Sequence, residues 1–283
     1  MRVTTTIAVA AAALAATAVP IGAPTAHAHA ASAGKPATAP AFVAYHGISA
    51  AQQSQRFPAL VKQGYRPISL SVSEPGGPRY AAVWTRRPGS AWALYQGMSP
   101  NGYQQRFDQY TAKGYRPTIV SATGSGGGAT FAAVFEKADG AFLARHGLTG
   151  SRLATVHAAQ IQAGRRLITV NAYGTAAEPR YAAVWAHGST GGTSLTVGKT
   201  AAEHQTEFLA RRAKGERPIL VSVGPGETYT AAWRKDDLGP WQAYAAMSAA
   251  AYQSRFDRLK AEGYHPVQVD AEDGRYAAIW AKD

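Results

Sequence analysis

A segment of about 50 residues, written five times, is the feature that most constrains how this chain can fold. A glycine recurs at equivalent positions, and an aromatic residue follows each glycine 17 to 21 positions later. Self-similarity at this period is typical of repeat proteins, in which each unit buries its apolar face against its neighbours. The glycines are Gly64, Gly114, Gly164, Gly215 and Gly263, and the aromatic residues are Trp84, Phe135, Trp185, Trp233 and Trp280.

Each repeat predicts a helix of about 14 residues before its glycine. A serine or threonine, the preferred helix N-cap, stands 15 positions before the glycine in every copy. The glycine suits the left-handed backbone at a helix end, and a proline three positions later in four copies prevents continuation. The predicted N-caps are Ser49, Ser99, Thr149, Thr200 and Ser248.

Three strands complete each repeat. A short β-branched run follows the proline, as in Ile68 to Val72, and a Gly/Pro-rich turn leads to a second strand such as Tyr80 to Trp84. We expect these two strands to form a hairpin. A third strand, beginning at Phe42 in the first copy, precedes the helix. The sequence therefore predicts an α+β repeat fold of five β-α-β-β units.

The two ends of the repeat region indicate how the units could be arranged. The region starts with a strand that precedes a helix and stops with the strand expected to pair with it. If Phe42 to Tyr45 pairs with Tyr276 to Trp280, the units close into a propeller-like ring without an exposed sheet edge. An open curved solenoid is the alternative.

The first 41 residues differ from the rest. Arg2, an apolar stretch from Ile7 to Val19 and the Ala-x-Ala patterns at positions 26 to 30 predict a signal peptide over residues 1–30. A disordered linker over residues 31–41 and one domain over residues 42–283 should follow. We therefore expect a secreted, extracellular protein. It has no cysteine, and no later apolar run approaches the roughly 20 residues that span a bilayer.

The chain is basic, with 29 Lys and Arg against 17 Asp and Glu, a formal charge of +12. Loss of Arg2 with the signal peptide leaves +11. Such a surface favours polyanions, including acidic wall polymers and nucleic acid, although high charge also serves solubility. The basic residues are scattered and form no dense tract.

A basic residue precedes the proline position in every repeat. In a closed ring, five equivalent cations could hold a carboxylate or phosphate. A cation just past a helix C-terminus is also favoured by the helix dipole, which gives a structural alternative. The five candidate ligand-binding residues are Arg66, Arg116, Arg166, Arg217 and His265.

Four histidines stand out. His46 and His146 precede a glycine where a strand meets a helix, and we regard them as candidate binding residues. His157 and His204 interrupt the apolar stripe of their helices, as buried structural histidines or as part of a site. No catalytic triad or metal-ligand spacing accompanies these residues, so we expect no catalytic residue, metal or cofactor.

Length varies almost only in the predicted hairpin tips, because the spacing from cap to glycine is constant. Variable loops on a rigid scaffold are where repeat proteins commonly bind partners. Simple drift at exposed turns would give the same pattern. The tips are Glu74 to Arg79, Gly124 to Thr130, Tyr173 to Arg180, Gly224 to Thr228 and Glu272 to Arg275.

The motif Gly-Tyr-Arg-Pro, a β-branched strand, Tyr-Ala-Ala-Val-Trp and Trp-x-x-Tyr-x-Gly resembles the bacterial tandem repeat of secreted proteins and of the amino-terminal part of fungal polyglycine hydrolases. It is clearest at Gly64 to Trp84, Gly114 to Phe135 and Gly263 to Trp280. In those hydrolases the serine chemistry belongs to a separate β-lactamase-like domain. The only Ser-x-x-Lys match, Ser32 to Lys35, lies in the tail. The resemblance therefore implies recognition or scaffolding and transfers no catalytic residue.

These observations favour a secreted, non-catalytic tandem-repeat module that binds an extracellular protein or glycan. One alternative is a hydrolase with a site assembled across repeats, in which a histidine such as His204 acts as base. Another is a cationic binder of anionic wall polymers. The sequence names no ligand and no oligomeric state.

Overall fold

The computed structural model describes residues 41–74, 76–188, 193–236 and 238–282. The predicted signal peptide and all but the last residue of the predicted linker lie outside the described residues. The described part is built from five copies of one unit, in the order strand, helix, strand, strand. The predicted β-α-β-β repeat is therefore confirmed.

The elements have the following bounds. The first unit contains β1 (Phe42–Ser49), α1 (Ala50–Lys62), β2 (Tyr65–Ser73) and β3 (Arg79–Arg86). The second contains β4 (Trp92–Met98), α2 (Pro100–Thr111), β5 (Tyr115–Thr123), a 3-10 turn (Gly126–Gly128) and β6 (Thr130–Lys137). The third contains β7 (Phe142–Leu148), α3 (Gly150–Gln162), β8 (Arg165–Gly174) and β9 (Pro179–His187). The fourth contains β10 (Ser194–Lys199), α4 (Ala201–Ala213), β11 (Arg217–Gly224) and β12 (Thr228–Arg234). The fifth contains β13 (Trp241–Met247), α5 (Ala249–Ala261), β14 (His265–Glu272) and β15 (Arg275–Ala281).

The helices begin and end where local chemistry predicts. Each predicted N-cap side chain accepts a hydrogen bond from the backbone N–H three residues later, which satisfies one of the free donors of the first turn. Each helix is followed by its repeat glycine at positive φ, between +70° and +85°. The helices have 12 or 13 residues. Both boundary predictions are confirmed.

Each unit has its own antiparallel sheet of three strands, in the order β1-β3-β2 for the first unit. Strand β1 pairs with β3, with Val43 opposite Trp84. Strand β15 pairs with β13 and β14. The predicted pairing of Phe42 to Tyr45 with Tyr276 to Trp280 is therefore wrong. The crossover through the helix carries the chain to the opposite edge of its own sheet, and the hairpin then places β3 in the middle, between β1 and β2.

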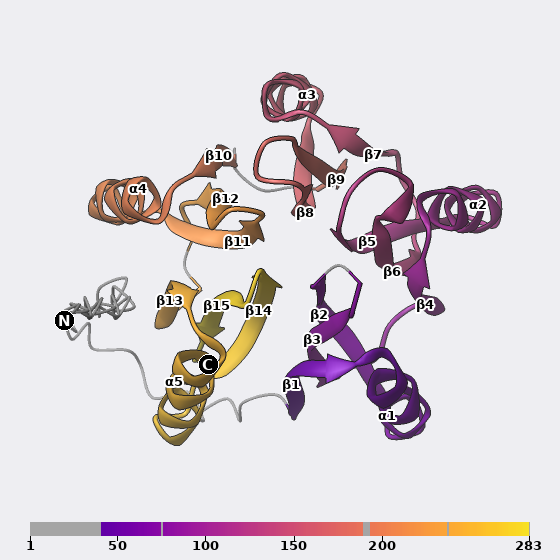
Figure 1. Ribbon diagram of the computed structural model, residues 1–283, viewed down its shortest axis with the longest axis horizontal. Helices are drawn as coiled ribbons and strands as arrows, with labels where there is room; N and C mark the ends of the chain where they lie inside the picture. Colours follow the sequence, from indigo (N-terminus) through magenta and orange to yellow (C-terminus); the bar gives the residue numbers. More distant parts are fainter. Residues whose placement is uncertain (1–40, 75, 189–192, 237, 283) are drawn as a thin grey trace, which may run out of the picture.

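Figure 1 shows the five units around a common centre, with the helices outermost and seen end-on. The first strand after each helix, namely β2, β5, β8, β11 and β14, lies innermost, and we call these five the axial strands. Each axial strand contacts the axial strand of the next unit, and β14 contacts β2. The ends of the helices and hairpins therefore form two opposite ends of the molecule.

The core lies between the sheets and the helices. The five repeat aromatics are at most 1% exposed, so the prediction that they are core residues is confirmed. The alanines of the middle strands are equally buried, which lets neighbouring sheets and helices approach closely. At four junctions a helix phenylalanine meets the first aromatic of the following unit edge-on, with ring centroids 5.8 to 6.2 Å apart. The pairs are Phe57–Trp92, Phe107–Phe142, Phe208–Trp241 and Phe256–Phe42.

Candidate functional site

The axial strands carry a polar side chain at the same position, seven residues after the repeat glycine, in all five units. These side chains are at most 4% exposed. Each one accepts a hydrogen bond of 2.8 to 3.1 Å from the backbone N–H of the preceding unit's axial strand. The donors are Val72, Ala122, Ala172, Val223 and Ala271. We call the acceptors, Ser71, Ser121, Asn171, Ser222 and Asp270, the axial polar ring.

The same bond joins the last unit to the first. The N–H of Ala271 donates to Ser71 Oγ at 3.1 Å, and the N–H of Val269 donates to Ser69 Oγ at 3.0 Å. Each serine hydroxyl also donates to the carbonyl of the same residue of β14. The axial strands are edge strands of five separate sheets, and their outer backbone N–H groups have no partner strand. Side chains of the neighbouring unit accept hydrogen bonds from these groups instead.

Two carboxyl groups lie buried at the axis. Burial raises the pKa of Asp270 to about 6, against opposing hydrogen bonds from Ser71 and Ser222. Burial also raises the pKa of Glu272 to about 8, and the nearby carboxylates Asp273 and Glu74 add to the shift. Glu272 Oε1 accepts a 2.8 Å bond from Thr123, two units away, whereas its Oε2 is buried without a partner. Glu272 is therefore neutral at pH 7 and contributes no charge at the axis.

A small cavity of about 60 Å³ opens among the axial strands, and Asp270 is one of its lining residues. It is lined by the starts of the axial strands, with Ile68, Ile119 and Ile168 at apolar positions and Asn171 and Asp270 at polar ones. Such a volume holds a few water-sized groups, whereas small-molecule pockets are commonly 300 to about 1,000 Å³. The axis therefore does not provide room for a substrate.

The predicted row of cations does not line this cavity. Arg66 is 5% exposed, lies 3.6 Å from Glu136 of the next unit and stacks over Trp92. Arg217 is 6% exposed and makes a bidentate pair with Asp236 at 2.5 and 2.8 Å. The best buried of these arginines are thus engaged in contacts within the protein.

The other three predicted cations lie one in each of the remaining units, at the start of the axial strand. Arg116 and Arg166 are partly buried at the start of β5 and β8. His265 is 5% exposed, and its ring lies 6.4 Å from that of Phe42. The structure does not bring the five cations together in one pocket around the axis.

His46 and His146 connect neighbouring units. His46 Nε2 lies 3.0 Å from Gln253 Oε1 on α5 and its ring packs edge-on against Tyr252. His146 Nε2 lies 3.4 Å from Gln104 Oε1 on α2, and burial lowers the pKa of His146. Gln96, at the equivalent position of the second unit, bonds Ser54 on α1 at 2.9 Å. The position therefore serves contacts between units.

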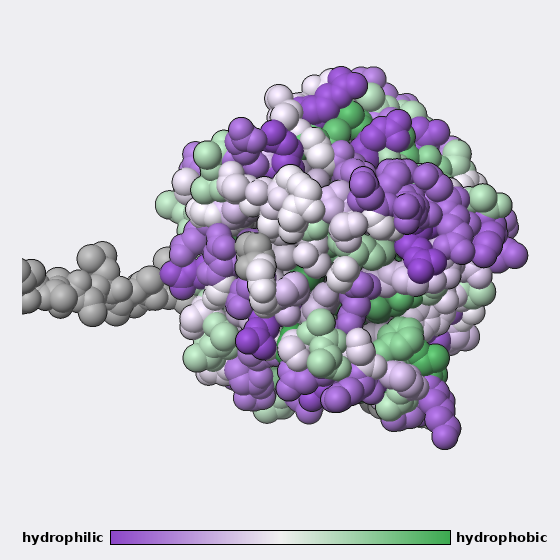
Figure 2. Space-filling model, turned by 45° about the vertical axis from the view of Figure 1, so that its right-hand side comes forward, coloured by the Kyte–Doolittle hydropathy of each residue, from purple (hydrophilic) through white to green (hydrophobic). Residues whose placement is uncertain are grey.

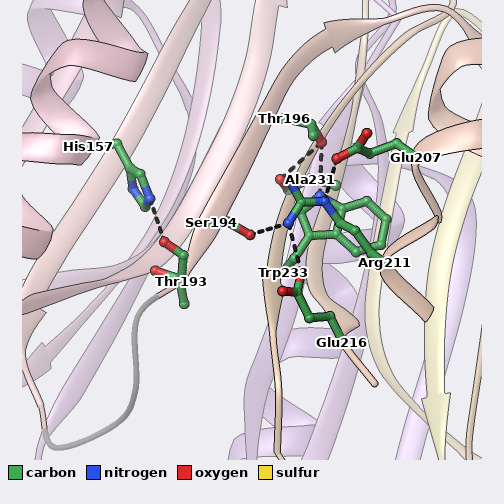
Figure 3. Close-up of polar contacts among 9 residues, drawn as sticks. All are labelled: His157, Thr193, Ser194, Thr196, Glu207, Arg211, Glu216, Ala231 and Trp233. Carbon is green, nitrogen blue, oxygen red and sulfur yellow. Dashed lines mark hydrogen bonds and ion pairs between the residues drawn. The ribbon is translucent and has the colours of Figure 1, made fainter. Parts of the chain in front are cut away.

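His157 is a hydrogen-bonded core residue, as Figure 3 shows. Its Nε2 lies 3.0 Å from the carbonyl oxygen of Thr193, and its Nδ1 accepts a bond from the indole of Trp185 at 3.2 Å. Burial lowers the pKa of His157. His157 replaces the phenylalanine, and Thr193 the first aromatic, of the pair found at the other four junctions. The junction of the third and fourth units is therefore polar where the others are aromatic.

Figure 3 also shows a charged network beside this junction. Arg211 on α4 pairs with Glu207 at 2.6 Å and with Glu216 at 2.8 Å, and it also bonds Ser194. Its guanidinium stacks over Trp233 at 5.4 Å. The network fixes the start of β10 against α4, so Arg211 is used within the fourth unit.

His204 is 1% exposed, and neither ring nitrogen has a hydrogen-bond partner. Its ring stacks on Tyr229 with centroids 5.3 Å apart. Burial lowers the pKa of His204 to about 4. His204 is therefore a buried, neutral histidine that packs against an aromatic ring.

The hairpin tips lie at the end of the molecule where the helices begin, because the N-cap Ser49 pairs opposite Arg79 in the sheet. Neighbouring tips contact each other: Gly174 N–H donates to Gly124 O at 2.9 Å, and Arg275 pairs with Glu227 at 2.6 Å. Most other tip positions are exposed. The tips therefore form a shared surface built from different residues in each unit.

Sequence reasoning missed the axial polar ring and the buried Glu272. The signal was present, because the position seven residues after the repeat glycine is polar in every copy. It was hidden by the β-branched run around it, which reads as an ordinary strand. Among the described residues, no group of three or more His, Cys, Asp or Glu is placed to hold a metal ion. None of the helices in the described ranges is long and apolar enough to cross a membrane.

Comparison with known proteins agrees with the repeat. The family model described as "Polyglycine hydrolase-like, structural repeat" matches the chain five times, at residues 39–87, 89–138, 139–187, 195–236 and 238–283. The fourth match begins at residue 195, just after Thr193, which stands where the other units have the first aromatic residue of the unit. No curated protein matches the chain.

Proposed function

The chain belongs to the polyglycine hydrolase-like structural repeat family, and on that premise we propose that it is a secreted, non-catalytic binding module. Its partner is an extracellular protein or glycan that contacts the hairpin tips. Secretion rests on the signal peptide predicted for residues 1–30.

One observation carries the proposal. The polar, basic and histidine positions that recur between repeats make contacts inside or between units. The tips are the places where both the length and the chemistry differ from unit to unit. The tip of the second unit contains three successive glycines, whereas the fifth carries Asp273 and Arg275. A rigid scaffold that varies only at one set of loops is suited to selecting one partner.

In this proposal the five units form a closed, propeller-like ring. The contact of β14 with β2 and the serine bonds of Ser69 and Ser71 to β14 support closure, as does the packing of Phe42 on Phe256. A ring holds all five tips at one end at fixed positions, so a partner meets a preformed surface.

A binding role also fits the chemistry of the interior. Asp270, whose carboxyl pKa is raised by burial, borders a cavity of only about 60 Å³, and Glu272, whose pKa is also raised, does not line that cavity. The candidate histidines contact glutamines, aromatic rings or a backbone carbonyl. These groups support packing and offer no open site at which a substrate could meet an acid and a base.

The test measures binding of the full chain to two kinds of probe: a polyglycine peptide, suggested by the name of the family, and a panel of insoluble and arrayed wall glycans. The tip variant carries Ser125→Arg and Ala177→Arg at exposed positions. The control variant carries Ala51→Arg and Ala202→Arg, on the exposed faces of α1 and α4, and adds the same charge. We expect the tip variant to lose at least about tenfold in affinity, because two large side chains at the contact typically cost more than 1.4 kcal/mol.

The control variant should bind like the natural chain. Equal loss in both variants would remove the tips as the binding surface. Cleavage of a peptide or glycan probe, abolished by a change at one residue such as His204→Gln, would replace the proposal by the hydrolase alternative.

A further inference from the structure

Lysine and arginine are distributed differently in this protein. Seven of the eight lysines in the described residues lie either within the three residues before a repeat glycine or two residues after a repeat aromatic. All seven are exposed. We call this set the lysine end: Lys62, Lys113, Lys137, Lys214, Lys235, Lys260 and Lys282.

These positions share one end of the molecule, opposite the hairpin tips. The residue two places after each aromatic lies beside the end of its own helix: Lys137 is opposite Tyr115 in the sheet, and Lys282 Nζ donates to the carbonyl of Glu262 at 2.9 Å. The same position is Arg86 in the first unit and His187 in the third, so it is basic in every repeat. The helices stand outermost around the common centre in Figure 1, so the cations at their C-terminal ends are spread around the rim of this end of the molecule.

The lysines remain available for a partner. Every ion pair among the described residues uses an arginine as its cation. The arginines also pair with two of the acids at this end: Glu136 pairs with Arg66 and Arg87, and Asp236 pairs with Arg217 and Arg234. The helix dipole explains why cations are favoured here. It does not neutralise seven exposed ammonium groups.

The exposed residues of the protein favour binding through charge over insertion of apolar side chains into a membrane or stacking on bases. Among the described residues, the exposed large hydrophobic side chains are Val61, Leu209 and Leu238, and none is aromatic. On the face in Figure 2, hydrophobic residues form small patches separated by hydrophilic ones. A membrane anchor would need a contiguous apolar patch, and single-stranded nucleic acid is usually bound by stacking on exposed aromatics.

We infer that the lysine end binds a flexible anionic polymer, such as a phosphate- or carboxylate-bearing wall polymer, through exposed lysines that form no ion pair within the described residues and are spread over four of the five units. Lysine acts as a hydrated point charge that tolerates many geometries, which fits a polymer without a fixed shape. The site is independent of the tips, so one end of the molecule could hold the polymer while the other contacts a partner.

The experiment measures binding of the full chain to inorganic polyphosphate and to polyglutamate at several salt concentrations. The lysine-end variant carries Lys62→Gln, Lys137→Gln, Lys235→Gln and Lys282→Gln. The matched control carries Arg56→Gln, Arg145→Gln, Arg152→Gln and Lys199→Gln, which removes the same charge from basic residues outside the lysine end. We expect the slope of log affinity against log salt to shrink by roughly 3 to 4 in the lysine-end variant, since each phosphate contact adds nearly one unit.

The control should keep most of the affinity and slope of the natural chain. Comparison of the two polymers identifies phosphate or carboxylate as the preferred group. The inference is overturned if neither polymer binds at low salt, or if both variants lose affinity equally. Tighter binding to duplex DNA than to either polymer, or binding only to anionic vesicles, would also overturn it. A variant with arginine at the same four positions should retain binding, which separates loss of charge from loss of folding.

Discussion

Two buried residues make the stability of this protein depend on pH, one as the pH becomes acidic and the other as it becomes alkaline. His204 is packed between aromatic rings without a hydrogen-bond partner, and Glu272 is held at the axis with one unpartnered oxygen. Both groups prefer to be neutral in the folded chain, because burial penalises their charged forms. The histidine is therefore neutral down to acidic pH, and the carboxyl group is neutral up to mildly alkaline pH.

The first prediction concerns acid. The folded pKa of His204 is about 4, below its ordinary value of 6.5, so the unfolded chain binds a proton that the folded chain does not as pH falls from 6.5 to 4. This group should therefore remove on the order of 3 kcal/mol of stability over that window. His204→Tyr, which restores the residue of the second and fifth units, should abolish this loss. The measurement is the free energy of unfolding in denaturant at pH 7 and pH 4.5.

His187→Tyr serves as the comparison, because His187 is exposed. It should leave the difference between the two pH values unchanged. If His204→Tyr also leaves it unchanged, His204 must already be hydrated or hydrogen-bonded in the folded state.

The second prediction concerns alkaline pH and has the opposite sign. The folded pKa of Glu272 is about 8, above its ordinary value of 4.5, so the unfolded chain loses a proton that the folded chain keeps as pH rises between these values. Stability should fall over that range by at most roughly 5 kcal/mol from this group. Glu272→Gln keeps the oxygen that Thr123 donates to and removes the titration. Denaturant unfolding at pH 5 and pH 8.5 should show the variant to be less pH-dependent than Glu178→Gln at an exposed tip.

At the scale of elements, the junctions between neighbouring units share one aromatic contact with a single exception. A helix phenylalanine meets a strand aromatic at four junctions, and His157 meets Thr193 at the remaining one. Both members of the pair changed together, which keeps the buried histidine hydrogen-bonded. At the junction of the third and fourth units, a hydrogen-bonded pair therefore takes the place of the aromatic pair.

The third prediction uses this junction as a double-mutant cycle. His157→Phe alone should destabilise the chain by about 1 to 3 kcal/mol, because the carbonyl of Thr193 and the indole of Trp185 lose their partner. Adding Thr193→Trp should recover about 0.5 to 1.5 kcal/mol through the restored aromatic pair. The coupling is obtained from denaturant unfolding of the two single variants and the double variant. Strictly additive costs would show that the two positions do not interact.

Sequence patterns predicted the elements and the hairpin of the last two strands in each unit correctly, but they gave the first strand the wrong partner. Caps and glycines such as Ser49 and Gly64 act locally, so the helix bounds followed from the sequence. Strand β1 was assigned to the wrong partner because its residues fit either neighbour, and the choice is made by the crossover through α1. The arginines and histidines could be found by their recurrence, but only the fold reveals that Arg66 meets Glu136 and His46 meets Gln253.

At the scale of the whole molecule, the axial polar ring replaces the strand pairing that the sequence suggested for closure. Five separate sheets leave five inner edges, and a side chain from the next unit bonds each of them. One sequence position per unit therefore does what a shared strand does in other propeller-like folds. In the closed ring that we propose, the junction of the last and first units is equivalent to the others.

The fourth prediction tests that equivalence. Ser121→Ala leaves the N–H of Val72 unpaired at the junction of the first two units, and Ser71→Ala leaves that of Ala271 unpaired at the junction of the last and first. In a closed ring, each change should lower the free energy of unfolding by a similar amount, about 1 to 3 kcal/mol, because a buried donor loses its acceptor. In an open solenoid, Ser71 would contact no fifth unit, so Ser71→Ala would cost less than about 0.5 kcal/mol while Ser121→Ala kept its full effect. Denaturant unfolding of both variants distinguishes the two cases, since an acceptor for a buried backbone N–H is removed once at a junction that the chain itself connects and once at a junction that it does not.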